Sequence, residues 1–307
     1  MASSDHLGRH AAVGDGLITL SAGDGTLNVV PAMGGRIASL VAAGREWLVQ
    51  SPPAGAPNAL RHLFWGSFLM VPWVGRLRDA SFGFDGRDHA FTPNLGSHAI
   101  HGLGADAPWT VTSASEDAAS LEIDLAEVAW PFAGRVRQSY RLGAGWLEMT
   151  AIIEADERMP VSLGWHPWFT LRDAPGATLL VDASGVLVTD ADLIPTGAIG
   201  TLGDDLDLGG APIVATRRID ATYVGIRAPI VLENTDWRIE IGWSEAISSA
   251  VVYTPPEAVC IEPQTAWPNA HGLPEGRTGE SGLRTLAPGE SLHATQRWAW
   301  RRRGEAA

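Results

Sequence analysis

Glycine and proline punctuate this chain so densely that long helices have little room to form. The 307 residues include 35 glycines and 20 prolines. Between these breaks, apolar and polar residues alternate at every second position, which is the period of a β-strand with one face buried. We find no convincing long amphipathic helix. The pattern predicts an all-β fold, built as a large sandwich or barrel of short strands.

The alternation is clearest in five runs. They span residues 135–142, 146–153, 237–241, 248–253 and 291–298. Residues 81–84 and 87–91 flank Asp85-Gly86, a dipeptide that accepts the positive φ angles of a type I′ hairpin turn. Residues 190–211 are rich in glycine and aspartate with few apolar anchors, which is typical of a long surface loop.

Charge and cysteine content narrow the range of partners. The 35 acidic and 22 basic residues give a net charge of −13, which argues against nucleic acid or an anionic membrane. Cys260 is the one cysteine, so no internal disulfide framework is possible and a reducing compartment is expected.

No apolar run approaches the roughly 20 residues of a membrane span, and the N-terminus lacks a signal-like segment. We expect a cytoplasmic protein, a monomer or weak homodimer, with one domain over residues 1–307 and a core of about 15–300.

One carboxylate stands in a stretch suited to carbohydrate. Residues 258–261 are a short apolar run, and Glu262 follows it directly before Pro263. Proline removes a ladder donor and keeps the preceding residue extended, so we expect Glu262 at a strand end, aimed into a cleft. Gln264, Thr265 and Trp267 follow. An acid, an amide, a hydroxyl and an indole on one turn suit a site for a polyol.

Two further stretches bring imidazoles to similar positions. His166 follows the predicted strand 160–163, precedes a proline, and has Trp165 and Trp168 as neighbours. His98 and His101 lie in a loop after residues 94–96. A single histidine or glutamate is more often a structural residue than a functional one. Three such clusters in one chain favour a shared functional site over three unrelated structural residues.

The set of motifs resembles the aldose 1-epimerases of the galactose mutarotase-like superfamily. It consists of Gly75-Arg76-Leu77, His101-Gly102, His166-Pro-Trp-Phe169 and Glu262-Pro-Gln-Thr265, and the resemblance covers about residues 34–298. It implies a large antiparallel β-supersandwich with an open concave sugar-binding cleft. It also implies a reaction that interconverts the α and β anomers of a free aldose, without a metal or an organic cofactor.

The resemblance assigns roles to individual residues. His166 matches the general acid that protonates the ring oxygen O5, and Glu262 matches the base that accepts the O1 proton. Arg76 and His101 match substrate-binding positions, and Asp220 matches the sugar-binding aspartate. We add three residues to the predicted sugar contacts: His98, Gln264 and Trp168.

Two departures from the family pattern bear on the sugar rather than on the reaction. His98 stands where many members have asparagine, and Ala221-Thr222 follow Asp220 where the family usually has other residues. Trp73, Trp168 and Trp267 are candidates for stacking on the apolar face of a pyranose, with core packing as the alternative for each.

The residue types suit ring opening on physical grounds. The reaction needs one proton delivered to O5 and one removed from O1, and a positioned acid or base contributes roughly 10²- to 10⁴-fold. With ordinary pKa values near ~4.3 for Glu and ~6.5 for His, an ionised Glu and a protonated His form the natural pair near neutrality. We expect the negative charges of Glu262 and Asp220 to favour the imidazolium form of His166.

A metal site could draw on four of these side chains, namely His98, His101, His166 and Glu262, but the sequence has no HExxH motif and one cysteine is too few for a thiolate cage, so we expect no metal. Two other interpretations stay open. The same fold could act on a hexose 6-phosphate, with Arg36, Arg76 and Arg78 as a cationic cluster at the cleft rim. The protein could also bind carbohydrate without catalysis. The sequence has no nucleophile elbow, Walker loop or dinucleotide fingerprint, so hydrolase, kinase and dehydrogenase functions have no support.

Overall fold

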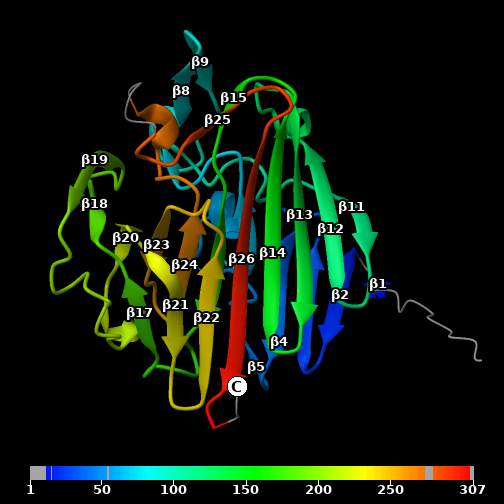
Figure 1. Ribbon diagram of the computed structural model, residues 1–307, viewed down its shortest axis with the longest axis vertical. Coiled ribbons are helices and arrows are strands. Elements are labelled where there is room, and N and C mark those ends of the chain that lie inside the picture. The colour runs from blue at the N-terminus through cyan, green and yellow to red at the C-terminus, as the bar shows by residue number, and fades with distance from the viewer. Residues whose placement is uncertain (1–11, 15, 54, 274–278, 305–307) are drawn as a thin grey trace, which may run out of the picture.

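Two large antiparallel sheets form the layers of the molecule, with the smaller one facing the viewer in Figure 1 and the larger one behind it. The structure is a computed structural model that describes residues 12–14, 16–53, 55–273 and 279–304. Within these residues the larger sheet has twelve strands and the smaller one eight. The prediction of an all-β fold with a large antiparallel sandwich is confirmed.

The larger sheet runs in the order β1-β2-β3-β4-β6-β16-β24-β23-β20-β18-β19, and β5 pairs with β4. Its strands are β1 (Ala12–Gly14), β2 (Leu17–Ala22), β3 (Gly25–Val30), β4 (Arg36–Ala42), β5 (Arg45–Glu46), β6 (Ser67–Met70), β16 (Gly164–Thr170), β18 (Gly185–Thr189), β19 (Pro195–Gly200), β20 (Asp220–Val224), β23 (Ser249–Tyr253) and β24 (Ala258–Gln264).

The smaller sheet runs in the order β11-β12-β13-β14-β26-β22-β21-β17. Its strands are β11 (Thr110–Ala114), β12 (Ala118–Asp124), β13 (Gly134–Gly143), β14 (Trp146–Ala155), β17 (Thr178–Asp182), β21 (Arg227–Glu233), β22 (Trp237–Trp243) and β26 (Ser291–Arg302).

Three short strand pairs and five short 3₁₀ segments lie outside the two large sheets among the described residues. The pairs are β7 (Arg76–Leu77) with β10 (Ala99–Ile100), β8 (Ser81–Phe84) with β9 (Arg87–Ala90), and β15 (Met159–Val161) with β25 (Arg284–Leu286). The 3₁₀ turns are η1 (Asn58–Leu63), η2 (Arg78–Ala80), η3 (Leu125–Val128), η4 (Val214–Thr216) and η5 (Ala270–Gly272). Among the described residues, none of these turns has the length and apolar character needed to cross a membrane.

Alternating side chains from both sheets build the core between the layers. In β13 the inward positions include Gln138 and Tyr140, which are buried in the midst of apolar neighbours. Gln138 donates a hydrogen bond to the carbonyl of Gly34, and the Tyr140 hydroxyl donates to the carbonyl of Gly35. A Cβ at Gly35 would lie 2.1 Å from the Gln138 amide nitrogen, so glycine is required there. These bonds satisfy buried polar groups and join the two sheets.

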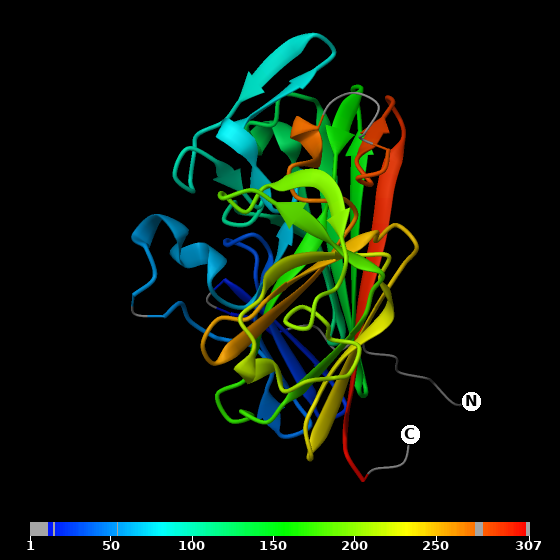
Figure 2. The same cartoon turned by 90° about the vertical axis from the view of Figure 1, so that its left-hand side faces the viewer.

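The middle of the larger sheet is buried on both faces. Every residue of β24 and nearly every residue of β16 is buried. Trp165 and Ile261 point into the core between the sheets, whereas the side chains of alternate residues emerge on the opposite face. Figure 2 shows loops and short strands covering part of this opposite face. That covered face carries the candidate site.

Of the local predictions from the sequence, one is confirmed and the others are wrong. The Asp85-Gly86 hairpin is confirmed, with φ of 51° and 72° at the two turn residues. The prediction of one loop over residues 190–211 is wrong, because β19 forms within it as an edge strand. Glu262 and His166 were both expected at strand ends, and both lie inside strands.

Candidate active site

Strand register brings the candidate residues into rows on the outer face of the larger sheet. Gly164 pairs with Gln264 and Trp168 with Cys260, which places His166 opposite Glu262. On the next strands Val251 pairs with Glu262, and Thr222 pairs with Val251. One row across the sheet is therefore Phe68, His166, Glu262, Val251 and Thr222. The next row, two residues along, is Trp168, Cys260, Tyr253 and Asp220.

The two prolines act inside the strands instead of ending them. Pairing between β16 and β24 is interrupted between the Gly164–Gln264 and Trp168–Cys260 positions. Pro167 and Pro263 lie in that interval, and neither has an N–H to donate to the ladder. Both strands nevertheless continue, because β16 also pairs with β6 and β24 also pairs with β23. His166 and Glu262 occupy the interrupted stretch.

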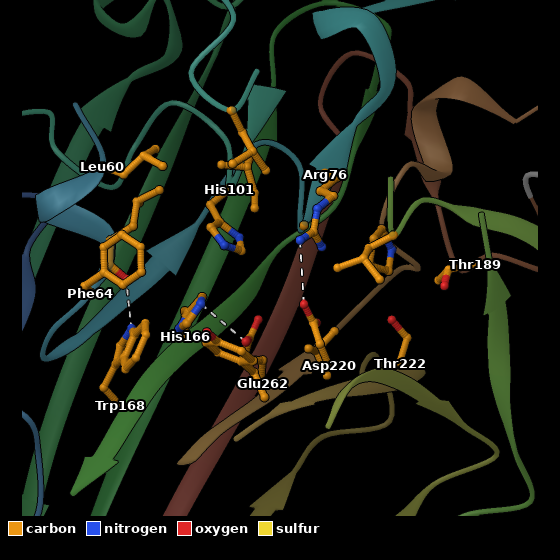
Figure 3. A pocket seen from close by; sticks show the side chains of 18 residues that line it. Leu60, Phe64, Arg76, His101, His166, Trp168, Thr189, Asp220, Thr222 and Glu262 are labelled. Carbon is orange, nitrogen blue, oxygen red and sulfur yellow. Dashed lines mark hydrogen bonds and ion pairs between the residues drawn. The ribbon is translucent and has the colours of Figure 1, made fainter. Parts of the chain in front are cut away.

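Aromatic rings fix the plane of the His166 imidazole. Phe68 stacks on one side at a centroid distance of 4.9 Å, and Trp168 stacks at 5.5 Å. His101 meets the ring edge-on, with centroids 4.7 Å apart. Nε2 of His166 lies 3.3 Å from Oε1 of Glu262, as Figure 3 shows. The pair is nearly excluded from water, since the exposed side-chain fractions are 5% and 3%.

His101 is held in place by its backbone. Its φ of 65° lies in the left-handed region, which a non-glycine residue seldom adopts without a reason. Its N–H donates to the carbonyl of Gly75. The following residue, Gly102, also has a positive φ, and a Cβ there would lie 2.2 Å from the carbonyl oxygen of Val71. The loop is thus fitted closely against the chain between β6 and β7, which directs His101 into the site.

A cation and a carboxylate form the opposite side of the site. Nη2 of Arg76 lies 3.6 Å from Oδ2 of Asp220, and both side chains are partly exposed. Figure 3 shows this pair next to Glu262. The Arg76–Asp220 ion pair and the His166–Glu262 contact together offer hydrogen-bond donors and acceptors within a single cleft.

These side chains line one cavity of about 200 Å³. Of the predicted site residues, the structure brings six together in it: Arg76, His101, His166, Trp168, Asp220 and Glu262. Other lining residues that the sequence did not point to include Phe64, Ile100, Thr189, Leu193, Thr222 and Tyr253. Period two along β20 and β23 could have indicated Thr222 and Tyr253, because they share a face with Asp220 and Val251. Phe64, Thr189 and Leu193 come from loops or strand ends without such a signal.

Two predicted contacts lie outside this lining. His98 sits between two carboxylates, with Nδ1 3.7 Å from Asp79 and Nε2 3.7 Å from Asp192. Nδ1 also accepts a hydrogen bond from the Asp79 N–H. Gln264 is fully buried, and both polar atoms of its side chain lack a partner among the described residues. The role of Gln264 in sugar binding stays a prediction, whereas His98 contacts the β18–β19 turn.

Only one of the three predicted stacking tryptophans reaches the cavity. Trp168 lines it and donates its indole N–H to the carbonyl of Leu63. Trp73 packs against Phe91 and Trp130 in the core. Trp267 is buried in a separate apolar cluster. Trp73 and Trp267 are therefore packed in the protein interior, which was the alternative to sugar stacking for each of them.

Burial controls the protonation of the central pair. It lowers the pKa of His166 to about 3, and the buried guanidinium of Arg36 acts in the same direction. Burial raises the pKa of Glu262 well above its ordinary value, with a smaller contribution from the Asp220 charge. The expected imidazolium is therefore disfavoured in this structure, because desolvation outweighs the attraction of the nearby carboxylates. One proton held by the pair rests on Glu262.

Three of the four residues in the metal interpretation lie together. The ligand atoms of His101, His166 and Glu262 are all within 4.8 Å of one another, while His98 is not part of this group. Two imidazoles and a carboxylate are ligands that zinc accepts. Each of the three also has a direct use in acid–base chemistry on a sugar, which requires no metal.

Comparisons with known proteins agree with this geometry. The sequence profile of a family described as aldose 1-epimerase matches residues 16–299. No curated protein matches the chain. Among solved structures, a putative aldose 1-epimerase from Escherichia coli K12 is 24% identical with a TM-score of 0.80, over 93% of this chain and 99% of that chain.

Two further structures show the same fold at lower identity. A galactose mutarotase-like protein from Clostridium acetobutylicum is 20% identical with a TM-score of 0.81, over 93% of this chain and 95% of that one. A galactose 1-epimerase from Lactobacillus acidophilus NCFM is 17% identical with a TM-score of 0.76, over 93% and 94%. With a family profile that matches nearly its whole length, the chain belongs to the aldose 1-epimerase family.

Proposed function

We propose that this protein is an aldose 1-epimerase that interconverts the α and β anomers of a free sugar by general acid–base ring opening. The observation that carries the proposal is the 3.3 Å contact between His166 and Glu262 on the floor of a small cavity. O1 and O5 of a cyclic aldose are both bonded to C1. An acid and a base that act on both oxygens at once must therefore lie close together, as adjacent strands place them.

The proton balance of the pair supports this chemistry. For ring opening, His166 as imidazolium gives its proton to O5 while the Glu262 carboxylate takes the proton of the O1 hydroxyl. The C1–O5 bond breaks and the aldehyde forms. His166 is then neutral and Glu262 protonated, which is the distribution that burial favours. Rotation about C1–C2 and ring closure with both transfers reversed give the other anomer.

The pair carries no net charge at either end of this cycle. Imidazolium with carboxylate sums to zero, and so does neutral imidazole with carboxylic acid. Since moving a net charge into a buried site is costly, a cycle that only shifts a proton suits this environment. Ring closure restores imidazolium and carboxylate, so the cycle regenerates its own starting state. In the resting protein, where burial favours neutral His166 and protonated Glu262, the direct contact between Nε2 and Oε1 provides the path by which the proton passes to His166 before ring opening.

The remaining side chains suit recognition of a sugar. Arg76 and Asp220 offer a donor and an acceptor for hydroxyl groups, and His101 adds an imidazole beside His166. Its pKa is lowered by burial and by the neighbouring His166, so that it stays neutral and can both donate and accept. Trp168 and Phe64 supply apolar surface for the carbon skeleton.

The hexose 6-phosphate alternative receives less support from the charges. Arg76 is the one arginine or lysine among the described residues that line the cavity, and it faces two carboxylates there, Asp220 and Glu262. Arg78 is engaged with Asp190, and Arg36 is buried with its guanidinium on the carbonyls of Trp65 and Ala105. The three arginines do not form a free cationic cluster for a phosphate.

Polarimetry on freshly dissolved α-glucose or α-galactose tests the proposal. The protein should accelerate the approach to equilibrium, and His166→Ala or Glu262→Gln should reduce kcat/KM by roughly 10²- to 10⁴-fold, because each removes one positioned proton-transfer group. His293→Ala, an exposed histidine on the smaller sheet, is the matched control and should leave the rate unchanged. Circular dichroism confirms that the variants fold.

Two results would overturn the proposal. If the folded wild-type protein does not change the rate but binds sugar in calorimetry, the non-catalytic alternative holds. If it is active and both variants keep full activity, the catalytic roles belong to other residues.

A further inference from the structure

A second, larger hollow adjoins the proposed catalytic cavity. It encloses about 1020 Å³ and shares three lining residues with that cavity: Phe64, Trp168 and Tyr253. In Figure 3, Phe64 and Trp168 lie at one end of the cleft, Arg76 and Thr189 lie toward the other, and His166 stands between them. The shared aromatic wall means that a molecule held against Trp168 in one hollow is in reach of the other.

Strand register explains why the two hollows follow one another. Along β16 the side chains of His166, Trp168 and Thr170 project from the same face of the sheet. The first two line the catalytic cavity, and the last two line the larger hollow. Ala258, which pairs with Thr170, lies in the same third row. Two residues of strand advance roughly 6.6 Å, a step comparable in size with one pyranose unit.

The side chains around the larger hollow suit a carbohydrate. Trp237, Tyr253 and Trp168 give it aromatic surface, and Arg45 stacks on Trp237 with its guanidinium carbon 4.1 Å from the ring centroid. Asn234 and Arg172 add polar groups with planar geometry at its edge. This combination of apolar rings with a few polar groups is the ordinary composition of a small-molecule site.

The charge of the larger hollow favours a neutral occupant. Its described lining includes four carboxylates and two guanidinium groups, an excess of two negative charges: Glu46, Asp173, Asp236, Glu257, Arg45 and Arg172. A phosphorylated or acidic sugar would meet repulsion there. An uncharged glycosyl unit would not.

We propose that the larger hollow is a second sugar subsite, and that the preferred substrate is a reducing disaccharide or longer oligosaccharide. This inference rests on the proposed function. The reducing-end aldose reacts between His166 and Glu262, and the neighbouring glycosyl unit lies over Thr170 and Ala258. The reacting unit keeps a free O1, as the chemistry requires.

The geometry also indicates the linkage. Trp168 stacks directly on His166, the residue proposed to act at O5. C6 of a pyranose is bonded to C5, beside O5, so a substituent on O6 leaves the catalytic cavity on the side of His166 and passes Trp168. A 1→6-linked disaccharide therefore reaches the second hollow more directly than a 1→4-linked one.

Initial mutarotation rates with matched sugars test this subsite. The sugars are glucose, isomaltose and melibiose as 1→6-linked examples, and maltose as a 1→4-linked one, all with glucose at the reducing end. We expect kcat/KM for isomaltose or melibiose to exceed that for glucose about tenfold, the low end of what one added pocket contact contributes.

A filling variant identifies the hollow responsible. Thr170 is half-buried and lines the larger hollow but not the catalytic cavity. Thr170→Trp should lower kcat/KM for the 1→6-linked sugars to the glucose value and leave glucose itself unchanged. Thr170→Val, which keeps the volume nearly constant, is the control and should alter neither.

The outcomes separate the subsite from the reaction. Equal kcat/KM for glucose and all disaccharides, with no effect of Thr170→Trp on any of them, overturns the subsite and leaves the epimerase intact. A preference for maltose that Thr170→Trp removes keeps the subsite and overturns the O6 linkage. If no sugar is turned over, the proposed function fails. The subsite is then tested by calorimetry, which measures the binding of isomaltose and of glucose. Tighter binding of isomaltose than glucose, lost in Thr170→Trp, supports it, and equal binding overturns it.

Discussion

At the scale of single residues, the proposed chemistry depends on two side chains that share a proton. His166 and Glu262 are in contact and almost fully buried, so that their protonation states are coupled. Between the two pKa values of the pair, one proton is present, and the pair contains one acid and one base. Outside that range the pair has two acids or two bases.

The pH dependence of kcat/KM for the free enzyme follows from this coupling. On the acid side, activity is lost when His166 becomes protonated while Glu262 is also protonated, so that the pair holds two protons and no base remains. This occurs near the His166 pKa of about 3. On the alkaline side, it is lost when Glu262 gives up the last proton, well above pH 4.5 because burial raises its pKa. We expect a plateau with its acid limit near pH 3 and its alkaline limit well above pH 4.5, measured by polarimetry across pH. A bell with inflections at 4.5 and 6.5 would show that both groups titrate at the ordinary values for Glu and His.

The sequence predicted the residues that line the cavity better than it predicted their protonation states and their neighbours. Six of the eight predicted site residues line the cavity, because their motifs combine a chemical group with a local backbone constraint, as in His101-Gly102. The protonation state of His166 could not be predicted, because it depends on burial by Phe68 and Trp168, which only the folded sheet provides. The position of His98 outside the cavity lining, beside Asp192, was not predictable, because the turn that Asp192 occupies is distant in sequence. Its role in sugar binding stays a prediction.

At the scale of elements, period two determines what the cleft contains. Once β16 and β24 are paired in register, every second residue projects onto the same face. The strand ends expected at Pro167 and Pro263 were wrong, since proline in a central strand costs only the bonds it cannot donate when the partner strand is also interrupted there. Register between distant strands was not predictable from the sequence, and it is register that sets His166 opposite Glu262.

The turn between β18 and β19 is a second element with a defined role. It contributes Leu193 to the cavity lining next to Thr189 of β18, and it is attached across the cleft by an ion pair between Asp190 and Arg78. Asp190 also accepts hydrogen bonds from the N–H groups of Asp192 and Ile194. The ion pair and these bonds hold the turn beside the proposed catalytic cavity.

Removing this attachment should weaken substrate binding more than chemistry. Asp190→Ala is expected to raise KM several-fold with little change in kcat, because the turn supplies Leu193 to the cavity lining, whereas the proposed proton transfers belong to His166 and Glu262. Steady-state polarimetry measures both constants. Asp182→Ala, which breaks an exposed ion pair with Arg227 on the smaller sheet, is the matched control. A selective loss of kcat in Asp190→Ala would contradict this role.

At the scale of the whole molecule, two antiparallel layers leave one face of the larger sheet for function. Fold class followed from short alternating runs between frequent glycines and prolines. Strand order did not, because β16 lies between β6 and β24, so that Ser67 pairs with Pro167 and Trp168 pairs with Cys260 across long stretches of chain. These non-local pairings bring the early arginine and histidine loops to the late glutamate strand.

In the proposed reaction, His166 and Glu262 act on O5 and O1 of one sugar in this cleft. A crystal structure of the Glu262→Gln variant with bound glucose tests this placement. We expect O5 of the pyranose within about 3.2 Å of Nε2 of His166, and O1 within the same distance of the side-chain amide that replaces the Glu262 carboxylate. A sugar bound elsewhere, or bound in the cleft with both oxygens turned away from these two side chains, would contradict it.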